Sequence, residues 1–182
     1  MGVVLVTGPT RSGKSEWAET LAARSHKSVI YVATAQDYAD DPEWQARISR
    51  HQQRRSPQWE TRSVPLELAA TLYAATSSEC LLVDALGTWL TNGLEQNEAV
   101  WETQVVKLLA SLNAAKSDVI LVAEEVGWGV VPAYPLGRLF RDRLGNLTRR
   151  VGAIADVVYL VTAGYVLNLS EMGTPLSNRQ EP

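Results

Sequence analysis

Short apolar runs alternate along the chain with longer stretches that mix apolar and polar residues. Four of the runs, VVLVT, SVIYVAT, CLLVDAL and DVILVAE, are near-continuous rather than alternating. Strands buried on both faces have this pattern, which is typical of a mostly parallel sheet covered by helices on both sides. The predicted strands cover residues 3–7, 28–34, 60–64, 80–86, 118–124 and 157–163.

The stretches between these runs have helical patterns. The predicted helices cover residues 15–23, 42–54, 66–75, 98–114 and 136–155. The repeated order of strand and then helix predicts an α/β fold of three layers with a mostly parallel central sheet. A chain of 182 residues suffices for one domain with a sizeable core. We therefore expect a single domain over residues 1–169 and a polar C-terminal tail over residues 170–182.

Composition narrows the class of protein further. Apolar residues make up 46% of the chain and charged residues 20%, the balance of a globular protein, and the formal net charge is −3. That charge argues against the basic footprint of a nucleic-acid-binding protein. We expect no membrane span and no signal peptide, because the apolar runs are too short for either. The single cysteine, Cys80, begins an apolar run and is expected to be a buried, inert thiol. These features predict a cytoplasmic location.

A glycine-rich segment, GPTRSGKS, follows the first predicted strand and precedes a predicted helix. It fits the phosphate-binding pattern G-x-x-x-x-G-K-[ST] in its required setting. Gly8 and Gly13 allow the backbone N–H groups to turn toward a phosphate, and the helix N-terminus adds partial positive charge. Lys14 is predicted to contact the β- and γ-phosphates of a nucleotide, and Ser15 to bind Mg²⁺.

Two further predicted strands end in acidic residues. Asp84 closes LLVD and is the predicted second magnesium ligand, because an ionised carboxylate at the end of a buried strand needs a partner. Glu124 and Glu125 close DVILVA, where they could orient a nucleophile or cap a helix, and the pattern favours neither. Parallel strands place their carboxyl ends at one edge of the sheet, where ligands bind. The residues up to this point predict nucleotide-dependent phosphoryl transfer.

The segment RISRHQQRRSPQW contains His51, one of two histidines in the chain. In the predicted helix over 42–54, with Pro42 at its first position, Trp44, Ile48 and His51 share one face. This spacing by itself favours a histidine packed against the protein core.

A second interpretation comes from the charges around the same histidine. Arg47, Arg50, Arg54 and Arg55 supply cationic donors suited to a polyphosphate. Neighbouring cations lower the pKa of an imidazole, so that His51 would stay neutral and available as a nucleophile. The spacing and the charges therefore leave both a structural and a nucleophilic role open for His51.

Several blocks, in order and with near-constant spacing over roughly the first 165 residues, carry a resemblance to a known family. They are LVTGPTRSGKS, YVATAQ, RISRHQQRRSPQW, LLVDALGTWLTN and EEVGWGVVPAYPLGRLFRDRLG. The last block is the most specific, whereas a P-loop alone is shared by many unrelated enzymes. The chain resembles the bifunctional adenosylcobinamide kinases / adenosylcobinamide-phosphate guanylyltransferases of cobalamin biosynthesis.

The resemblance implies a RecA-like P-loop NTPase domain and a homotrimer. It implies that ATP or GTP phosphorylates the aminopropanol hydroxyl of adenosylcobinamide. It also implies that a histidine, matched here by His51, attacks the α-phosphate of GTP, expels pyrophosphate and carries GMP. Adenosylcobinamide phosphate then accepts the GMP to give adenosylcobinamide-GDP. A phosphoramidate of this kind divides one difficult displacement into two easier ones.

The same resemblance assigns site residues. His51 and Lys14 are the expected catalytic residues, and Ser15 and Asp84 the expected Mg²⁺ ligands. The expected nucleotide contacts are Gly8, Pro9, Thr10, Arg11, Ser12, Gly13, Lys14, Ser15, Thr34, Ala35, Gln36, Gln52, Gln53, Arg54, Arg55, Ser63 and Asp84.

The chain also departs from the family pattern at three places. Ser63 stands where the family has a glutamate that contacts guanine, which predicts a weaker guanine contact. Thr148 and Arg149 replace an asparagine–glutamine pair and are expected to alter corrinoid or subunit contacts. Glu124 and Glu125 replace an asparagine–glutamate pair. The P-loop and His51 are unaffected, so both activities are expected.

Two other functions agree with the P-loop. One is a different small-molecule kinase, in which His51 is structural and no covalent intermediate forms. The other is a nucleotide-gated binding module without enzymatic activity.

Overall fold

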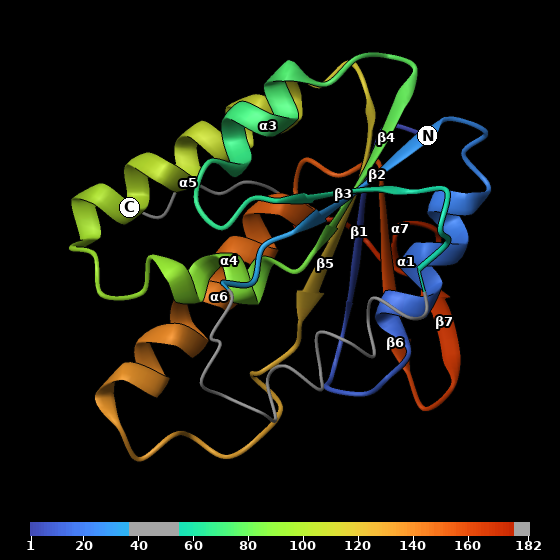
Figure 1. The fold of residues 1–182 in the computed structure, drawn as a ribbon. Helices are drawn as coiled ribbons and strands as arrows, with labels where there is room; N and C mark the ends of the chain where they lie inside the picture. Colours follow the sequence, from blue (N-terminus) through green and yellow to red (C-terminus); the bar gives the residue numbers. More distant parts are fainter. Residues whose placement is uncertain (37–54, 177–182) are drawn as a thin grey trace.

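A seven-stranded sheet forms the centre of the described residues, 1–36 and 55–176, of the computed structural model (Figure 1). The strands lie in the order β3-β2-β4-β5-β1-β6-β7. Their bounds are β1 Val3–Gly8, β2 Ser28–Ala33, β3 Glu60–Ser63, β4 Glu79–Asp84, β5 Asp118–Glu124, β6 Val157–Thr162 and β7 Tyr165–Asn168.

All neighbouring strands of the sheet pair in parallel except β6 and β7, which are antiparallel. The predicted mostly parallel sheet is therefore confirmed, but β7 was not predicted. It spans four residues and follows β6 after a turn in which Ala163 and Gly164 both have positive φ angles, 50° and 80°. Positive φ at both central residues is the geometry of a tight hairpin turn, which needs no long apolar run to form.

Helices cover both faces of this sheet (Figure 1). On one face lies α1, Lys14–Ala23, whose buried side chains pack against β1, β4 and β5. The other face carries α3 Leu68–Ala74, α4 Leu86–Asn92, α5 Glu98–Asn113 and α6 Pro135–Gly152. The predicted three-layer α/β fold is confirmed.

Two short helices were not predicted. The strand expected over residues 80–86 ends at Asp84, and α4 begins two residues later. The hydroxyl of Thr88 accepts a hydrogen bond from the N–H of Ala85, which satisfies a backbone donor at the start of this helix. The second is α7, Leu169–Met172, where the hydroxyl of Ser170 accepts a hydrogen bond from the N–H of Val158 in β6.

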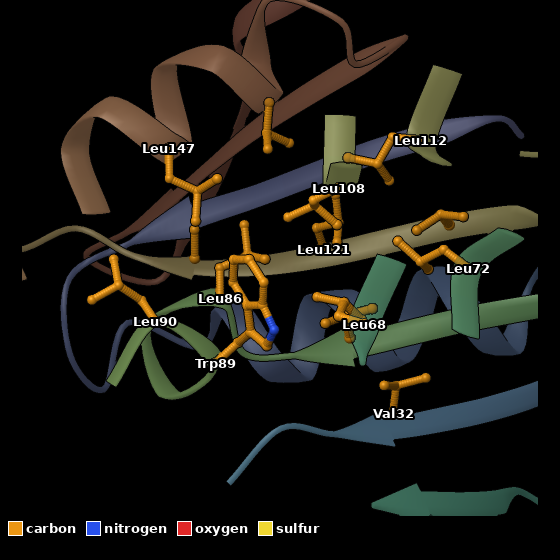
Figure 2. Packing of buried hydrophobic residues seen from close by; sticks show 14 of the residues in the cluster. Val32, Leu68, Leu72, Leu86, Trp89, Leu90, Leu108, Leu112, Leu121 and Leu147 are labelled. Atoms are coloured by element: carbon orange, nitrogen blue, oxygen red, sulfur yellow. The ribbon is translucent and has the colours of Figure 1, made fainter. Parts of the chain in front are cut away.

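The core explains why the strand sequences are almost continuously apolar. Val3 and Leu5 of β1 pack in the cluster on the side of α3–α6, whereas Val4 and Val6 pack on the side of α1. Figure 2 shows the larger cluster, in which Leu121 of β5 lies close to side chains of the covering helices. Each central strand therefore buries both of its faces, and neither face can be polar.

The structure bears on the expectations for the cysteine and for membrane spans, but not on all of those for the segment 42–54 and the C-terminal tail. Cys80 is fully buried, and burial raises the pKa of its thiol, as expected for an inert cysteine. The predicted helix over 42–54 lies outside the described residues, as do residues 177–182 of the predicted tail. The boundary between domain and tail stays a prediction. Within the described ranges, no helix has both the length and the apolar character that crossing a bilayer requires.

Candidate functional site

The glycine-rich segment joins β1 to α1 in a conformation that depends on its two glycines. A Cβ atom at Gly8 would lie only 2.2 Å from the carbonyl oxygen of Val161, so a larger residue would displace the neighbouring strand. Gly13 has a φ angle of 95° and is the N-cap of α1. The loop therefore has the strand–turn–helix form in which backbone N–H groups at a helix N-terminus bind phosphate.

Two side chains of the first turn of α1 lie at the carboxyl ends of the central strands. Lys14 is buried, and its Nζ donates a 3.3 Å hydrogen bond to the carbonyl oxygen of Pro9. The hydroxyl of Ser15 lies 3.5 Å from Oδ1 of Asp84, the last residue of β4. A hydroxyl and a carboxylate are hard oxygen donors of the kind that Mg²⁺ prefers. The donor set therefore fits a magnesium ion that also contacts nucleotide phosphates.

The other carboxylate oxygen of Asp84 is held by a tyrosine that sequence reasoning missed. The phenolic hydroxyl of Tyr31 donates a 2.6 Å hydrogen bond to Oδ2 of Asp84. Burial and the nearby carboxylate raise the pKa of Tyr31, so that its phenol stays neutral and remains a donor. The guanidinium carbon of Arg55 lies 3.5 Å from the centre of the same ring. A tyrosine inside the apolar run SVIYVAT looks like an ordinary core residue, and no sequence signal separates the two roles.

A fully buried threonine anchors the backbone that follows Asp84. The hydroxyl of Thr34 donates to the carbonyl oxygen of Ala85 at 2.7 Å and accepts from the N–H of the same residue at 2.9 Å. The amide of Asn92 donates to the carbonyl oxygen of Thr34 at 2.7 Å. Ala35 and Gln36 follow as half-buried residues. Thr34, an expected nucleotide contact, thus supports the position of Asp84.

Glu124 ends β5 directly beside the phosphate loop, where it is paired with Gly8 in the sheet register. Its Oε2 accepts a 3.0 Å hydrogen bond from the N–H of Gly87, in the first turn of α4. Burial raises the pKa of this carboxyl, while the positive charge of Lys14 opposes the shift and Asp84 adds to it. Of the two interpretations given to this acidic pair, helix capping is therefore seen at Glu124. Glu125 accepts instead from the N–H of Gly127 within the following loop.

A pocket of about 280 Å³ opens at the carboxyl end of β5, against α6. It is lined by Glu124, Glu125, Val126, Gly127, Arg141, Asp142, Gly145, Asn146 and Thr148. Of these residues, Thr148 was expected only as a departure from the family pattern, and Arg141 was not an expected site residue. The loop that leaves the pocket exposes large apolar side chains at Trp128, Val130 and Tyr134.

The remaining expected site residues are not all in one place. Pro9, Thr10, Arg11 and Ser12 lie within the phosphate loop, and Arg11 has a φ angle of 60°. Ser63 is exposed at the end of the edge strand β3, and one strand, β2, separates it from Asp84 of β4. His51, Gln52, Gln53 and Arg54 lie outside the described residues.

Comparisons with known proteins place the chain in a family. The sequence model of the family described as cobinamide kinase / cobinamide phosphate guanyltransferase matches residues 4–169. The bifunctional adenosylcobalamin biosynthesis protein CobP of Pseudomonas aeruginosa is 41% identical over 174 residues, which cover 94% of this chain and 98% of that protein. The corresponding CobU of Escherichia coli is 34% identical over 177 residues, covering 89% and 96% of the two chains.

A solved structure from Pyrococcus horikoshii OT3, Project ID PH0250, is also similar in fold. It has a TM-score of 0.57 and covers 100% of this chain and 94% of its own, with 8% sequence identity. At that identity the likeness concerns the fold alone.

Proposed function

This chain belongs to the cobinamide kinase / cobinamide phosphate guanyltransferase family. From that premise we propose which of its residues act in the kinase reaction and which act in the guanylyltransferase reaction. The protein is a bifunctional enzyme of adenosylcobalamin biosynthesis, a cobinamide kinase and a cobinamide phosphate guanylyltransferase. The observation that carries the assignment of residues is the meeting of the phosphate loop with Asp84, where Ser15 lies 3.5 Å from the carboxylate.

In the kinase reaction the loop from Gly8 to Ser15 binds ATP or GTP through its backbone N–H groups. Lys14 contacts the β- and γ-phosphates as the γ-phosphoryl group passes to the aminopropanol hydroxyl of adenosylcobinamide. Ser15 and Asp84 would hold Mg²⁺ beside these phosphates. When bound, the ion neutralises charge on the phosphate oxygens. Tyr31, through its 2.6 Å hydrogen bond, orients the Asp84 carboxylate.

In the guanylyltransferase reaction His51 attacks the α-phosphorus of GTP. A phosphorus–nitrogen bond forms, the bond to the bridging oxygen breaks, and pyrophosphate leaves. A phosphate oxygen of adenosylcobinamide phosphate then displaces the histidine from GMP. The charge environment supports this role, because cationic donors stabilise a triphosphate under attack. Arg55, four residues after His51, lies over Tyr31 and so places the end of this segment beside Asp84.

The other expected nucleotide contacts remain part of this proposal. Gln52, Gln53 and Arg54 neighbour His51 in the sequence, and Ser63 would contact guanine through a single hydroxyl. A hydroxyl is a weaker partner for guanine than a carboxylate, because hydrogen bonds to charged groups are the stronger ones. The proposed enzyme therefore discriminates less sharply between guanine and adenine nucleotides than a family member with a glutamate at this position.

We also propose a homotrimer located in the cytoplasm. The exposed apolar side chains of Trp128, Val130 and Tyr134 support an association surface, because large apolar patches on proteins commonly mark interfaces. Light scattering during gel filtration would test the trimer. A monomeric wild-type protein at micromolar concentration would contradict it.

The deciding experiment for the two reactions is labelling with GTP that carries a radioactive α-phosphate. We expect covalent labelling of the wild-type protein that survives denaturing electrophoresis, resists alkali and is lost in acid, as expected of a phosphoramidate. His51→Asn should lose both the label and guanylyl transfer but retain kinase turnover, because γ-phosphoryl transfer needs no protein nucleophile.

The second histidine supplies a matched control for this experiment. His26 is exposed in a loop with a φ angle of 55°, a conformation that asparagine tolerates. His26→Asn should therefore keep the label and both activities. Kinase activity without any label in the wild-type protein would instead indicate a P-loop kinase of another kind. Nucleotide binding without either activity would indicate a binding module.

A further inference from the structure

Two polar atoms in the wall of the 280 Å³ pocket lack hydrogen-bond partners among the described residues. They are Nη1 of Arg141 and Oγ1 of Thr148, both on α6 and both buried. The other terminal nitrogen of Arg141 donates a 2.6 Å hydrogen bond to the carbonyl oxygen of Gly127, which fixes the guanidinium in place. Buried polar groups are nearly always paired, so this pocket has hydrogen-bonding capacity that a ligand would satisfy.

The pocket adjoins the phosphate loop through Glu124, which belongs to both. Glu124 is paired with Gly8 in the sheet register, and the N–H of Glu125 donates a 2.8 Å hydrogen bond to the carbonyl oxygen of Gly8. The charges of Lys14 and Asp84 both act on the Glu124 carboxylate. A ligand in the pocket would therefore lie next to the residues that hold the nucleotide phosphates.

The charges of the pocket decide which substrate it suits. Three carboxylates, those of Glu124, Glu125 and Asp142, stand against the single guanidinium of Arg141. A nucleotide polyphosphate would be repelled there, whereas hydroxyl and carboxamide groups can donate hydrogen bonds to carboxylates. The pocket volume of about 280 Å³ lies just below the usual range for ligand pockets, so the pocket suits one arm of a larger molecule.

We propose that this pocket seats the hydroxyl-bearing arm of the corrinoid acceptor, with Glu124 accepting the proton of the hydroxyl in the kinase reaction. The proposal rests on the kinase function described above. The acceptor oxygen forms a bond to the γ-phosphorus, and the bond from that phosphorus to the β–γ bridging oxygen breaks. The nucleoside diphosphate leaves with the electron pair, and the hydroxyl proton passes to Glu124. The hydrogen bond from Gly87 to Oε2 holds the carboxylate in position for this transfer.

The pocket is tested directly by measuring the binding of adenosylcobinamide in the absence of nucleotide. Equilibrium dialysis suits this measurement, because the corrinoid is coloured. Thr148→Val keeps the shape of the side chain and removes its hydroxyl, and Arg141→Met removes the guanidinium. We expect each change to raise the corrinoid dissociation constant by about tenfold, in keeping with the loss of one good hydrogen bond. The same substitutions should raise the dissociation constant of a fluorescent GTP analogue much less.

Arg150→Met is the matched control, because Arg150 lies on the same helix but pairs with Glu102 of α5. It should leave corrinoid binding unchanged. Melting temperatures show whether each variant folds, and the isosteric Thr148→Val keeps the test decisive if Arg141→Met does not fold. Unchanged corrinoid binding in Thr148→Val, or an equal loss of GTP and corrinoid binding, would overturn the pocket assignment.

Glu124→Gln tests the proton acceptor, because the amide oxygen can still accept from Gly87 but cannot act as an equivalent base. We expect the kinase kcat to fall by about a hundredfold or more, with little change in the KM for nucleotide. A wild-type kcat in this variant would overturn the role of Glu124. Absence of cobinamide phosphorylation by the wild-type protein would instead contradict the proposed function, so the two failures are distinguishable.

Discussion

The phenolic oxygen of Tyr31 lies 2.6 Å from Oδ2 of Asp84, although the two residues are 53 positions apart in the sequence. The contact joins neighbouring parallel strands, since Ala33 of β2 is paired with Asp84 of β4. It leaves Oδ1 of Asp84 toward the hydroxyl of Ser15. One carboxylate thus has its two oxygens assigned to different partners, a buried phenol on one side and the proposed magnesium site on the other.

Tyr31→Phe should therefore weaken magnesium binding without unfolding the protein. The phenyl ring keeps the packing under Arg55 and removes only the hydrogen bond to Asp84. Loss of a partner that orients a metal ligand typically costs ten- to a hundredfold in metal affinity, and we expect about tenfold here. Magnesium titrations of both GTP binding and kinase rate would measure the change. Identical magnesium dependence in the wild-type protein and Tyr31→Phe would show that Tyr31 is only a core residue.

Asp84→Asn should reduce kinase activity more severely. The substitution keeps the shape of the side chain and removes the charge opposite Ser15, so we expect the rate to fall by about a hundred- to ten-thousandfold. Steady-state kinetics at saturating nucleotide, with a magnesium titration, would measure this loss. An unchanged rate and magnesium requirement would refute the assignment of Asp84 as a metal ligand.

Lys14→Ala should abolish both activities while the fold persists. The ammonium group donates a hydrogen bond to the carbonyl oxygen of Pro9 in the phosphate loop. Its loss removes the positive charge proposed to contact the β- and γ-phosphates. We expect at least a hundredfold decrease in kcat/KM, together with weaker GTP binding. Lys116→Ala is a suitable control, because Lys116 is exposed in the loop after α5. Normal turnover by a folded Lys14→Ala protein would contradict the P-loop assignment.

The stability of the protein should depend on pH through Glu124. Burial raises the pKa of this carboxyl in the folded state, so between the unfolded and folded pKa values the folded state binds more protons. The free energy of unfolding must then decrease as the pH rises through that interval. Glu124→Gln removes the titration and keeps an acceptor for Gly87. Above the interval the variant should be more stable than the wild-type protein and should melt at a higher temperature.

Below the same interval the carboxyl is protonated in both states, and the advantage of Glu124→Gln should vanish. Thermal unfolding of the two proteins at about pH 4 and about pH 8 would therefore give different stability differences. A constant difference at both pH values would show that Glu124 does not titrate differently in the folded and unfolded states. Glu124→Gln should thus gain stability and lose kinase activity, as is common for residues strained by function.

Much of the fold follows from the sequence alone. Near-continuous apolar runs such as VVLVT and DVILVAE have no polar face, so they can only form strands that are covered on both sides. The phosphate loop could also be predicted from the sequence, because the required glycines, Lys14 and Ser15 are close together in the chain. Local spacing suffices wherever the interacting residues are close in sequence.

The contacts between site residues that are distant in the sequence depend on the register between the strands. Tyr31 becomes a partner of Asp84, and Glu124 a partner of Gly87, because parallel pairing brings the ends of β2, β4, β5 and the start of α4 together. The helix α4 was missed because its first turn is completed by Glu124, which is 37 residues away from Gly87. The pocket likewise exists only because α6 packs beside the end of β5. A sequence lists such residues without distances between them, and their chemistry depends on distance.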